Sequence, residues 1–324
     1  MSSDGYAFWL AEPGRGEIRP VEVPAPGPDE VLVRTLHTGV SRGTETLVFT
    51  GRVPESQWSA MRAPFQEGEF PAPVKYGYLN VGVVEQGPAE LLGKNVFSLY
   101  THQTRFVVPA SAVTVVPDGV PAHRAVLAGT VETAVNALWD ARPLVGDRIA
   151  VVGGGMVGGS AAAILARFPG VRLQLVDVDE SRAELAARVG AGFARPADAL
   201  GECDLVIHAS ATAAGLTRSL ELLAPEGTVV ELSWYGDEQV SVPLGEFFHS
   251  RRLTVRGSQV GGIDPGRRRS YAERLALSLE LLTDERFEAL VTGHSPFAEL
   301  PDVLPRLADG RLPALCHVID YPEE

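Results

Sequence analysis

Arg148-Ile-Ala-Val-Val-Gly-Gly-Gly-Met-Val-Gly-Gly-Ser160 is the stretch that decides the fold. Four apolar residues, from Ile149 to Val152, lead directly into glycines spaced as G-x-G-x-x-G, and a run of small apolar residues follows. The pattern predicts a strand, a tight turn and a helix. The first glycine permits the turn, the second lets the backbone approach a diphosphate, and the third lets helix and strand pack closely. Because the N-terminus of a helix attracts anions, the stretch predicts a dinucleotide site.

A second predicted strand, residues 171–176, indicates which dinucleotide binds. It ends at Asp177, 19 residues beyond Gly158, close to the spacing of the acid that binds the adenosine ribose. Asp177 would accept hydrogen bonds from both ribose hydroxyls and repel a 2′-phosphate, and Arg182 lies too far into the next helix to reverse that preference. We therefore predict NAD, with NADP less favoured. The expected cofactor contacts are Gly153, Gly155, Met156, Val157, Gly158, Asp177, Arg182, Thr133 and Ser210.

Composition excludes several classes of protein. The 324 residues carry a net charge of −13, with 45% hydrophobic and 21% charged residues. Such a length suggests two domains, and the negative charge argues against nucleic acid or an anionic membrane as partner. Two distant cysteines, Cys203 and Cys316, exclude a disulfide framework and fit a reducing compartment, where both would be small core residues. No leader pattern or run of about 18 apolar residues is visible, so we expect a soluble cytoplasmic protein acting on a small molecule.

The hydrophobic pattern changes near residue 120. Before it, short strands alternate with proline- and glycine-rich turns, which predicts an antiparallel barrel or sandwich. After it, strands alternate with helices, which predicts a parallel sheet covered by helices on both faces. Residues 289–321 return to strand and short helix. The chain is therefore expected to be an α/β protein with two differently built domains.

Residues 47–75 interrupt the first series of strands. Trp58, Met61, Phe65 and Phe70 stand there among prolines and charges. A long irregular segment in a compact domain is usually functional or disordered. We predict that these side chains cover a large or apolar substrate; the alternative is a subunit contact or packing on their own domain.

Several motifs together resemble the medium-chain dehydrogenases and reductases over essentially the whole chain. The motifs are Pro24-Ala-Pro-Gly-Pro-Asp-Glu-Val-Leu-Val33, Phe106-Val-Val-Pro-Ala110, Val116-Pro-Asp-Gly119, residues 127–133, Gly146-Asp-Arg148 and Val291-Thr-Gly-His294. The resemblance implies a GroES-like β-barrel catalytic domain from residues 1–119 and 289–324. It implies a Rossmann domain, a doubly wound parallel sheet, from residues 120–288. It also implies a homodimer, with strand 253–259 at an edge of the sheet.

The resemblance is incomplete where a catalytic zinc would be held. Positions that match the family's zinc ligands read Ser41, Tyr78 and Gly129, and none is a good ligand because zinc requires thiolate, imidazole or carboxylate. The four-cysteine lobe is also missing, since residues 97–103 run directly into the next strand. We therefore predict a member without zinc or any other metal. Two segments are similar to the bacteriochlorophyllide dehydrogenase-like branch of the family: Ser41-Arg-Gly-Thr-Glu45 and the sequence of residues 65–78. This similarity implies oxidation of a secondary alcohol with NAD.

Without zinc, another group must stabilise the negative charge that develops on the substrate oxygen. Tyr78 is the first candidate because it matches a zinc ligand, and a nearby Lys75 would lower the pKa of its phenol. The alternative is that Tyr78 only fills the vacated metal space.

Other polar side chains are candidates around this donor. Ser41 or Thr44 would relay a proton and Glu45 would orient Arg42, unless these residues only form a capped turn into a helix. Glu132 would contact nicotinamide or substrate, as Thr133 beside it would. His102 is a candidate substrate contact but is more simply interpreted as a surface residue. His208 is expected to line the adenosine side or to pack internally.

Three functions remain open from the sequence. The first is an NAD-dependent, zinc-independent alcohol dehydrogenase or ketone reductase. The second is reduction of an enone or quinone, and the third is a non-catalytic nucleotide-binding protein. A polar donor beside the hydride acceptor favours the first.

Overall fold

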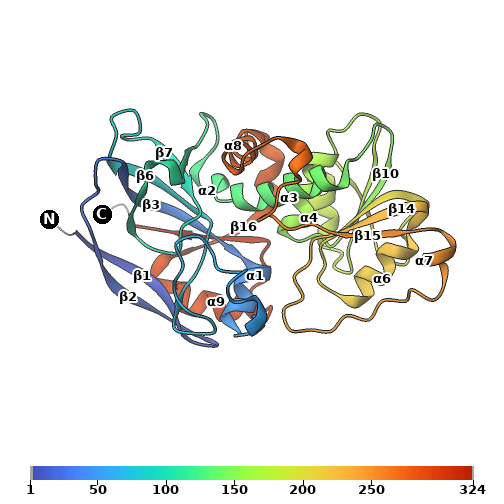
Figure 1. Cartoon of the computed structure of the whole chain (residues 1–324), viewed down its shortest axis with the longest axis horizontal. Coiled ribbons are helices and arrows are strands. Elements are labelled where there is room, and N and C mark those ends of the chain that lie inside the picture. Colours follow the sequence, from blue (N-terminus) through green and yellow to red (C-terminus); the bar gives the residue numbers. More distant parts are fainter. Residues whose placement is uncertain (1–2, 323–324) are drawn as a thin grey trace. The chain divides into compact units, whose positions relative to one another are not determined.

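The computed structural model describes residues 3–322 (Figure 1). Contacts divide the chain into a first unit, residues 1–129, 275–283 and 291–324, and a second unit, residues 130–274 and 284–290. Residues 120–129 therefore belong with the first unit. The reason is packing: the short helix α2 (Ala122–Ala125) contacts β3 and β6 of that unit.

The first unit is built from two sheets. One has the order β2-β1-β5-β4, and the other has the order β16-β17-β3-β6-β7-β9, with β8 also paired to β3. Helices α1 (Arg42–Phe49) and α9 (Leu300–Ala308) contact each other beside them. The strands are β1 (Ser3–Glu12), β2 (Arg15–Val23), β3 (Glu30–Ser41), β4 (Glu67–Gly68), β5 (Val74–Lys75), β6 (Asn80–Gln86), β7 (Asn95–Ser98), β8 (Arg105–Pro109), β9 (Val113–Val115), β16 (Val291–Pro296) and β17 (Cys316–Asp320).

Strand β3 holds the larger sheet together because it pairs with β6, β8 and β17. Its alternate residues Val31 and Val33 enter a core with Val84, Val96 and Phe106. Pairing of β3 with β17 joins the start of the chain to its end, with Ser41 opposite Cys316. The last segment thus completes the larger sheet of the first unit.

The second unit is a six-stranded parallel sheet with the order β12-β11-β10-β13-β14-β15. Sequence order reverses direction between β10 and β13, which is the point where doubly wound sheets bind ligands. The predicted Rossmann architecture is confirmed, and β15 lies at the sheet edge. The strands are β10 (Arg148–Val152), β11 (Arg172–Val176), β12 (Gly192–Ala194), β13 (Cys203–His208), β14 (Leu223–Glu231) and β15 (Thr254–Gly257).

Helices α4 and α6 follow the two central strands (Figure 1). Right-handed crossovers that leave the switch point in opposite directions put these helices on opposite faces of the sheet. Small residues bring α4 close to its neighbours, since a Cβ on Gly159 would lie 2.5 Å from Leu290 Cδ2. The longer helices of the second unit are α3 (Ala128–Ala141), α4 (Met156–Leu165), α5 (Arg182–Val189) and α6 (Ala213–Glu221), and α7 (Phe247–Ser250) is a single turn. Helix α8 (Tyr271–Leu281) begins in the second unit and continues into the first.

The hydrophobic pattern predicts helices over residues 122–140 and 265–282, and both differ in extent in the structure. The first is interrupted between α2 and α3. The helix expected from Pro265 begins only at Tyr271, because Arg268 has a φ of 51°, a left-handed conformation that a right-handed helix does not contain.

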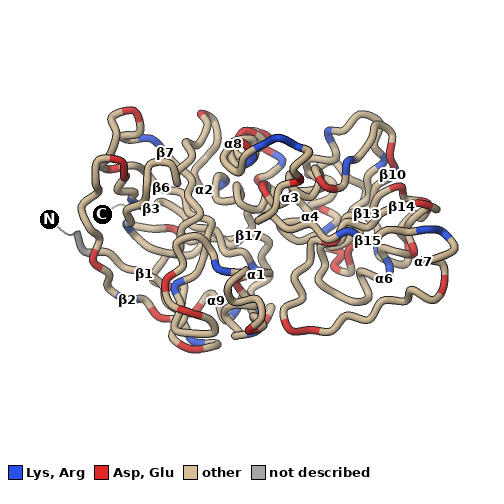
Figure 2. The backbone as a smooth tube through the Cα atoms, in the orientation of Figure 1, with Lys and Arg blue, Asp and Glu red and all other residues tan. Residues whose placement is uncertain are grey.

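Charged residues of both signs are interspersed along the backbone (Figure 2). In the basic run 267–269, Arg267 donates to the carbonyl of Trp139 at 2.5 Å and Arg269 pairs with Glu273 at 3.4 Å. These contacts fit a solvated protein face better than a phosphate-binding patch. Within residues 3–322, no helix is long and apolar enough to cross a membrane.

Candidate functional site

The glycine loop after β10 has two positions that the protein itself reserves for glycine. Gly153 has a φ of +106°, and a Cβ there would lie 2.7 Å from the backbone nitrogen of Ser210. A Cβ on Gly158 would lie 1.9 Å from the carbonyl oxygen of Gly153. By contrast, a Cβ on Gly155, the N-cap of α4, would meet no atom within 4 Å. The first and third glycines therefore serve packing, and the space beside the second is open.

This difference gives a direct prediction. Gly158→Ala should lower stability by about 1–3 kcal/mol because the added methyl group meets fixed backbone. Gly155→Ala should leave the melting temperature unchanged but weaken NADH binding at least about tenfold, or ~1.4 kcal/mol. Thermal unfolding and NADH fluorescence titration measure the two effects. Unchanged NADH affinity in Gly155→Ala would show that the open position is not used by the cofactor.

Asp177, which follows β11, contacts the glycine loop directly. Its Oδ2 accepts a hydrogen bond from Gly154 N at 2.6 Å, and its Oδ1 accepts one from Asp179 N at 2.9 Å. Arg182 pairs with Asp179 at 3.2 Å, so its charge is partly compensated inside the unit. Hydrogen bonds from Ser181, followed by the charge of Arg182, lower the pKa of Asp179. The two carboxylates therefore keep this end of β11 negative. Met156 and Val157 form the first turn of α4.

A polar cluster follows the carboxyl ends of β13 and β14, and the sequence analysis identified only part of it. His208 is fully buried and lies opposite Glu231 in the strand register. Its Nδ1 is 2.7 Å from Glu231 Oε2, and its Nε2 is 2.7 Å from Ser210 Oγ. Burial raises the pKa of Glu231, but hydrogen bonds from His208 and Ser233 outweigh that effect and the pKa is lowered. Glu231 is thus held as a carboxylate.

Glu132 and Thr133 lie in α3, and the Glu132 side chain is buried within the second unit. Its Oε1 accepts from Arg274 Nε at 3.0 Å, and both side chains are buried. Arg274 also donates to Asn136 Oδ1 at 2.5 Å and to Val260 O at 2.6 Å. Burial raises the pKa of Glu132 and Arg274 opposes that rise. The carboxylate expected to contact substrate is therefore engaged in a buried ion pair, while Thr133 is half-buried.

In the first unit, the structure brings Tyr78, Ser41 and Thr44 together. The Ser41 and Thr44 side chains hydrogen-bond the Tyr78 phenol. Burial, followed by the negative charge of Glu45, raises the pKa of Tyr78 to about 12, and the two hydrogen bonds act in the opposite direction. The phenol therefore remains a hydrogen-bond donor at neutral pH.

Lys75 does not have the role expected of it. Its ammonium group is buried, pairs with Glu67 and donates to Gln103 Oε1 at 2.6 Å. Burial lowers the pKa of Lys75, and Glu67 opposes that change. The expectation that Lys75 lowers the pKa of Tyr78 is therefore corrected: that pKa is raised, and the lysine charge is compensated by Glu67.

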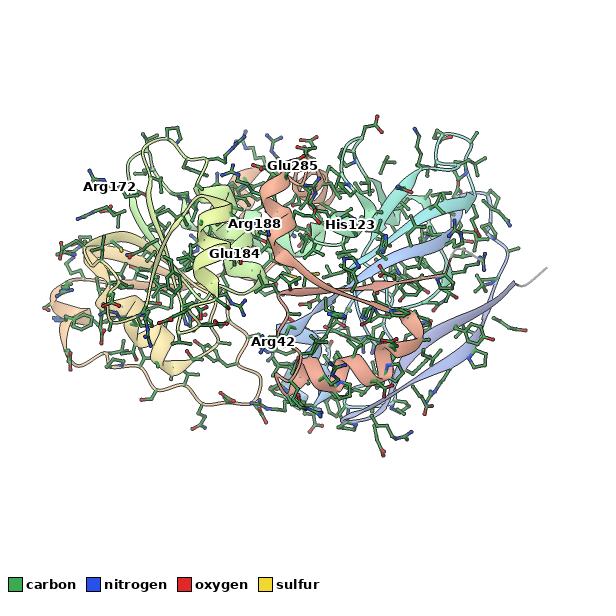
Figure 3. All side chains as sticks on the ribbon, turned by 180° about the vertical axis from the view of Figure 1, so that it is seen from behind. Arg42, His123, Arg172, Glu184, Arg188 and Glu285 are labelled. Atoms are coloured by element: carbon green, nitrogen blue, oxygen red, sulfur yellow. The ribbon has the colours of Figure 1, made fainter. Side chains whose placement is uncertain are left out.

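Glu45 and His102 form a buried pair behind the hydroxyl cluster. Glu45 Oε1 accepts from Ser41 N at 2.7 Å, and Oε2 lies 2.9 Å from His102 Nε2. His102 Nδ1 lies 2.6 Å from Thr38 Oγ1. His102 is only 2% exposed, so its interpretation as a surface residue is wrong. Glu45 binds His102 instead of orienting Arg42, which is exposed at the start of α1 (Figure 3).

The aromatic segment is anchored to its own unit. Phe70 is buried and packs on Tyr76 with ring centroids 5.7 Å apart, so it is a core residue. Phe65 packs on Tyr100 at 5.4 Å yet stays 39% exposed. The half-buried Trp58 donates from Nε1 to Val53 O at 3.0 Å. Among the four predicted substrate-covering side chains, only Phe65 is an exposed one; the fourth, Met61, is half-buried.

The side chains present do not fit a zinc ion. Hydroxyl groups and a glycine occupy the three positions noted above, and a Cβ on Gly129 would lie 2.6 Å from Leu79 Cδ2. Both ring nitrogens of the neighbouring His102 already have partners. Over the part of the chain that the structure describes, no three His, Cys, Asp or Glu side chains are grouped so as to hold a metal ion.

Comparisons with known proteins agree with this architecture. Residues 158–279 match the family model of the zinc-binding dehydrogenases. The fold is that of the medium-chain dehydrogenases. A comparison with curated proteins finds no match.

Solved structures resemble the chain over nearly its full length. L-idonate 5-dehydrogenase from Escherichia coli K-12 is 16% identical, with a TM-score of 0.83, covering 99% of both chains. A putative zinc-binding dehydrogenase from Sinorhizobium meliloti 1021 bound to NADP is 18% identical, with a TM-score of 0.78, covering 98% of this chain and 99% of that one. An alcohol dehydrogenase from E. coli CFT073 complexed with NADH is 17% identical, with a TM-score of 0.77, also covering 98% and 99%. Identities this low establish the fold alone.

Proposed function

We propose that the protein is an NAD(H)-dependent oxidoreductase that interconverts a secondary alcohol and a ketone without zinc. The observation that carries this proposal is the Tyr78 phenol, hydrogen-bonded by Ser41 and Thr44 where the family resemblance leads one to expect a metal ligand. A hydroxyl donor at that position supports carbonyl chemistry over reduction of a carbon–carbon double bond, because only the carbonyl develops charge on oxygen.

The cofactor would be held by the loop between β10 and α4. When bound, the nicotinamide ring supplies or accepts the hydride. The open space at Gly155 and the N-terminus of α4 would take the diphosphate. Asp177 would accept hydrogen bonds from the ribose hydroxyls, and its charge with that of Asp179 disfavours a 2′-phosphate. Structures of similar fold contain either NADP or NADH, so the preference for NAD rests on these two carboxylates.

Tyr78 would stabilise the negative charge that forms on the substrate oxygen. Because its pKa is raised to about 12, the phenol is protonated and acts as a hydrogen-bond donor over the neutral range. Ser41 and Thr44 would orient the phenol and pass a proton between it and water. Hydrogen bonds aimed at developing charge are among the larger contributions to catalysis.

The substrate would be fairly large or apolar. Support comes from Phe65, which stays partly exposed although it is anchored on Tyr100. The similarity of residues 65–78 to the bacteriochlorophyllide dehydrogenase-like branch leads to the same proposal. We further propose a cytoplasmic homodimer that associates through the edge strand β15, whose Val255 is exposed.

The test is turnover by purified protein of known metal content. We expect oxidation of NADH, at a rate well above that with NADPH, when bulky aromatic ketones are supplied, and no loss of rate after treatment with a zinc chelator. The same panel contains enones and quinones. Stoichiometric zinc, a preference for NADPH, or turnover of enones and quinones alone would each contradict a stated part of the proposal. Binding of NADH without any turnover would favour the non-catalytic alternative.

A further inference from the structure

The cluster at the ends of β13 and β14 is a continuous chain of hydrogen bonds. It runs from Glu231 to the His208 imidazole, from there to Ser210 Oγ, and from Ser210 to Thr212 Oγ1 at 2.9 Å. His208 is completely buried, whereas Ser210 is half-exposed. Thr212 is exposed, so a ligand can meet the hydrogen-bonded cluster at its Ser210–Thr212 end, where Ser210 is the member that contacts the imidazole.

At the Glu231 end of this hydrogen-bond chain, the direction of each hydrogen bond is defined. The lowered pKa of Glu231 makes it a carboxylate, which only accepts hydrogen bonds. Its Oε1 accepts from Ser233 N at 2.7 Å, and its Oε2 accepts from Tyr235 OH at 3.1 Å as well as from the imidazole. His208 Nδ1 must therefore carry a hydrogen in both charge states of the ring. Any change in protonation takes place at Nε2, the atom that faces Ser210.

Protonation at Nε2 reverses what Ser210 offers to a ligand. When Nε2 is bare, it accepts the Ser210 O–H, and the hydroxyl oxygen can only accept further bonds. When Nε2 carries a proton, it donates to Ser210 Oγ and releases the O–H outward. Thr212 Oγ1 accepts from Gly215 N at 3.0 Å and still has a hydrogen that it can donate to Ser210, which leaves the Ser210 O–H available to a ligand.

The position of Ser210 connects this change to the cofactor site. Ser210 lies so close to the glycine loop that a Cβ on Gly153 would be 2.7 Å from its backbone nitrogen. It also follows β13, one of the two strands at the switch point of the sheet. Phosphate oxygens in a dinucleotide only accept hydrogen bonds, and their negative charge favours a protonated imidazole nearby.

We propose that His208 is a positioning residue whose protonation is linked to binding of the dinucleotide diphosphate through the Ser210 hydroxyl. The inference rests on the proposed function, because it requires a dinucleotide in this loop. Binding then takes up one proton near neutral pH, where histidine is the side chain that ordinarily changes charge. The affinity is then higher at low pH, where the imidazole is protonated, and falls as the pH rises.

Few other titratable groups face His208. Glu231 and Tyr235 belong to the β14 side and are already in the chain of hydrogen bonds. Helix α4 contains no titratable side chain except hydroxyl groups. Helix α6 carries Arg218 and Glu221, which pair with each other at 2.8 Å. A pH effect on binding can therefore be assigned to His208 by substitution.

The experiment measures NADH binding by calorimetry in two buffers of different ionisation enthalpy, together with the Kd between pH 6 and 9. For the native chain we expect net uptake of up to one proton per NADH and a Kd that rises by up to about tenfold per pH unit in part of this range. His208→Gln retains an amide that can donate to Ser210 but does not titrate. It should bind NADH with no proton uptake and a flat Kd profile. His249→Gln, which changes an exposed histidine of the same unit, should behave as the native chain.

Ser210→Ala is the second variant, because it leaves the buried pair intact if His208→Gln does not fold. It should weaken NADH binding and reduce proton uptake. Undiminished uptake in either variant, or none in the native chain, would overturn the inference while leaving the proposed function standing. A native chain that does not bind NADH at any pH would overturn both.

Discussion

Tyr78→Phe is expected to lower kcat for ketone reduction by about 10²–10³-fold, the usual effect of removing one hydrogen-bond donor from a developing oxyanion. The substitution removes a single oxygen and leaves the ring that packs edge-on against Tyr76, with centroids 6.0 Å apart. The NADH Kd should remain unchanged, because none of the residues expected to bind the cofactor depends on the phenol. Steady-state kinetics and a fluorescence titration of the same preparation measure the two quantities.

Tyr76→Phe provides the matched control. Tyr76 is buried beside Tyr78 and loses the same atom, but burial and the charges of Tyr78 and Glu45 raise its pKa, with no contribution from Ser41 or Thr44 hydroxyls. Its kcat should stay within a fewfold of the native value. If Tyr78→Phe and Tyr76→Phe behave alike, Tyr78 only fills space, which is the alternative that the sequence left open.

The pH profile gives an independent check on the same residue. Since the pKa of Tyr78 is raised to about 12, the donor form persists throughout the range in which the protein is handled. A loss of rate centred well below pH 10 therefore cannot come from this phenol. Such a loss would have to remain in Tyr78→Phe.

The glycine loop could be predicted from sequence because everything that determines it is local. The apolar strand, the glycines and the small residues of α4 are contiguous, and the backbone conformation of Gly153 follows from the turn they form. Asp177 could be predicted as a ribose contact from its spacing alone, since it lies in the same βαβ unit as the loop. Local pattern and global fold agree there.

The polar pairs could not be predicted because the partners meet only through the tertiary fold. Glu45 and His102 are 57 residues apart, and nothing in a linear pattern selects His102 over other histidines as the partner. Lys75 was assigned to Tyr78 because the two are close in sequence, but the register of β4 against β5 places Glu67 directly opposite it. Sheet register also brings Glu231 to His208, a pairing that the sequence alone did not predict.

The largest effect on stability is expected from the Glu45–His102 pair. Both side chains are at most 4% exposed and are 2.9 Å apart. Removing one member of a buried pair leaves the other without its partner and typically costs about 3–5 kcal/mol. Glu45→Ala should therefore lower the melting temperature by roughly 6–20 °C, given about 2–4 °C per kcal/mol for a unit of this size. Scanning calorimetry measures this shift.

The double variant separates a specific pair from two independent contributions. If Glu45 and His102 stabilise each other, Glu45→Ala with His102→Ala should cost less than the sum of the two single changes, by about 0.5–3 kcal/mol. Glu12→Ala removes an exposed carboxylate paired with Arg15 and should leave the melting temperature unchanged. If the free-energy costs of the two buried substitutions are strictly additive, the Glu45–His102 hydrogen bond is not what holds α1 to the segment around His102. Ser41 N also donates a hydrogen bond to Glu45. Glu45→Ala should therefore loosen the Ser41–Tyr78 contact as well, and reduce kcat beyond its effect on stability.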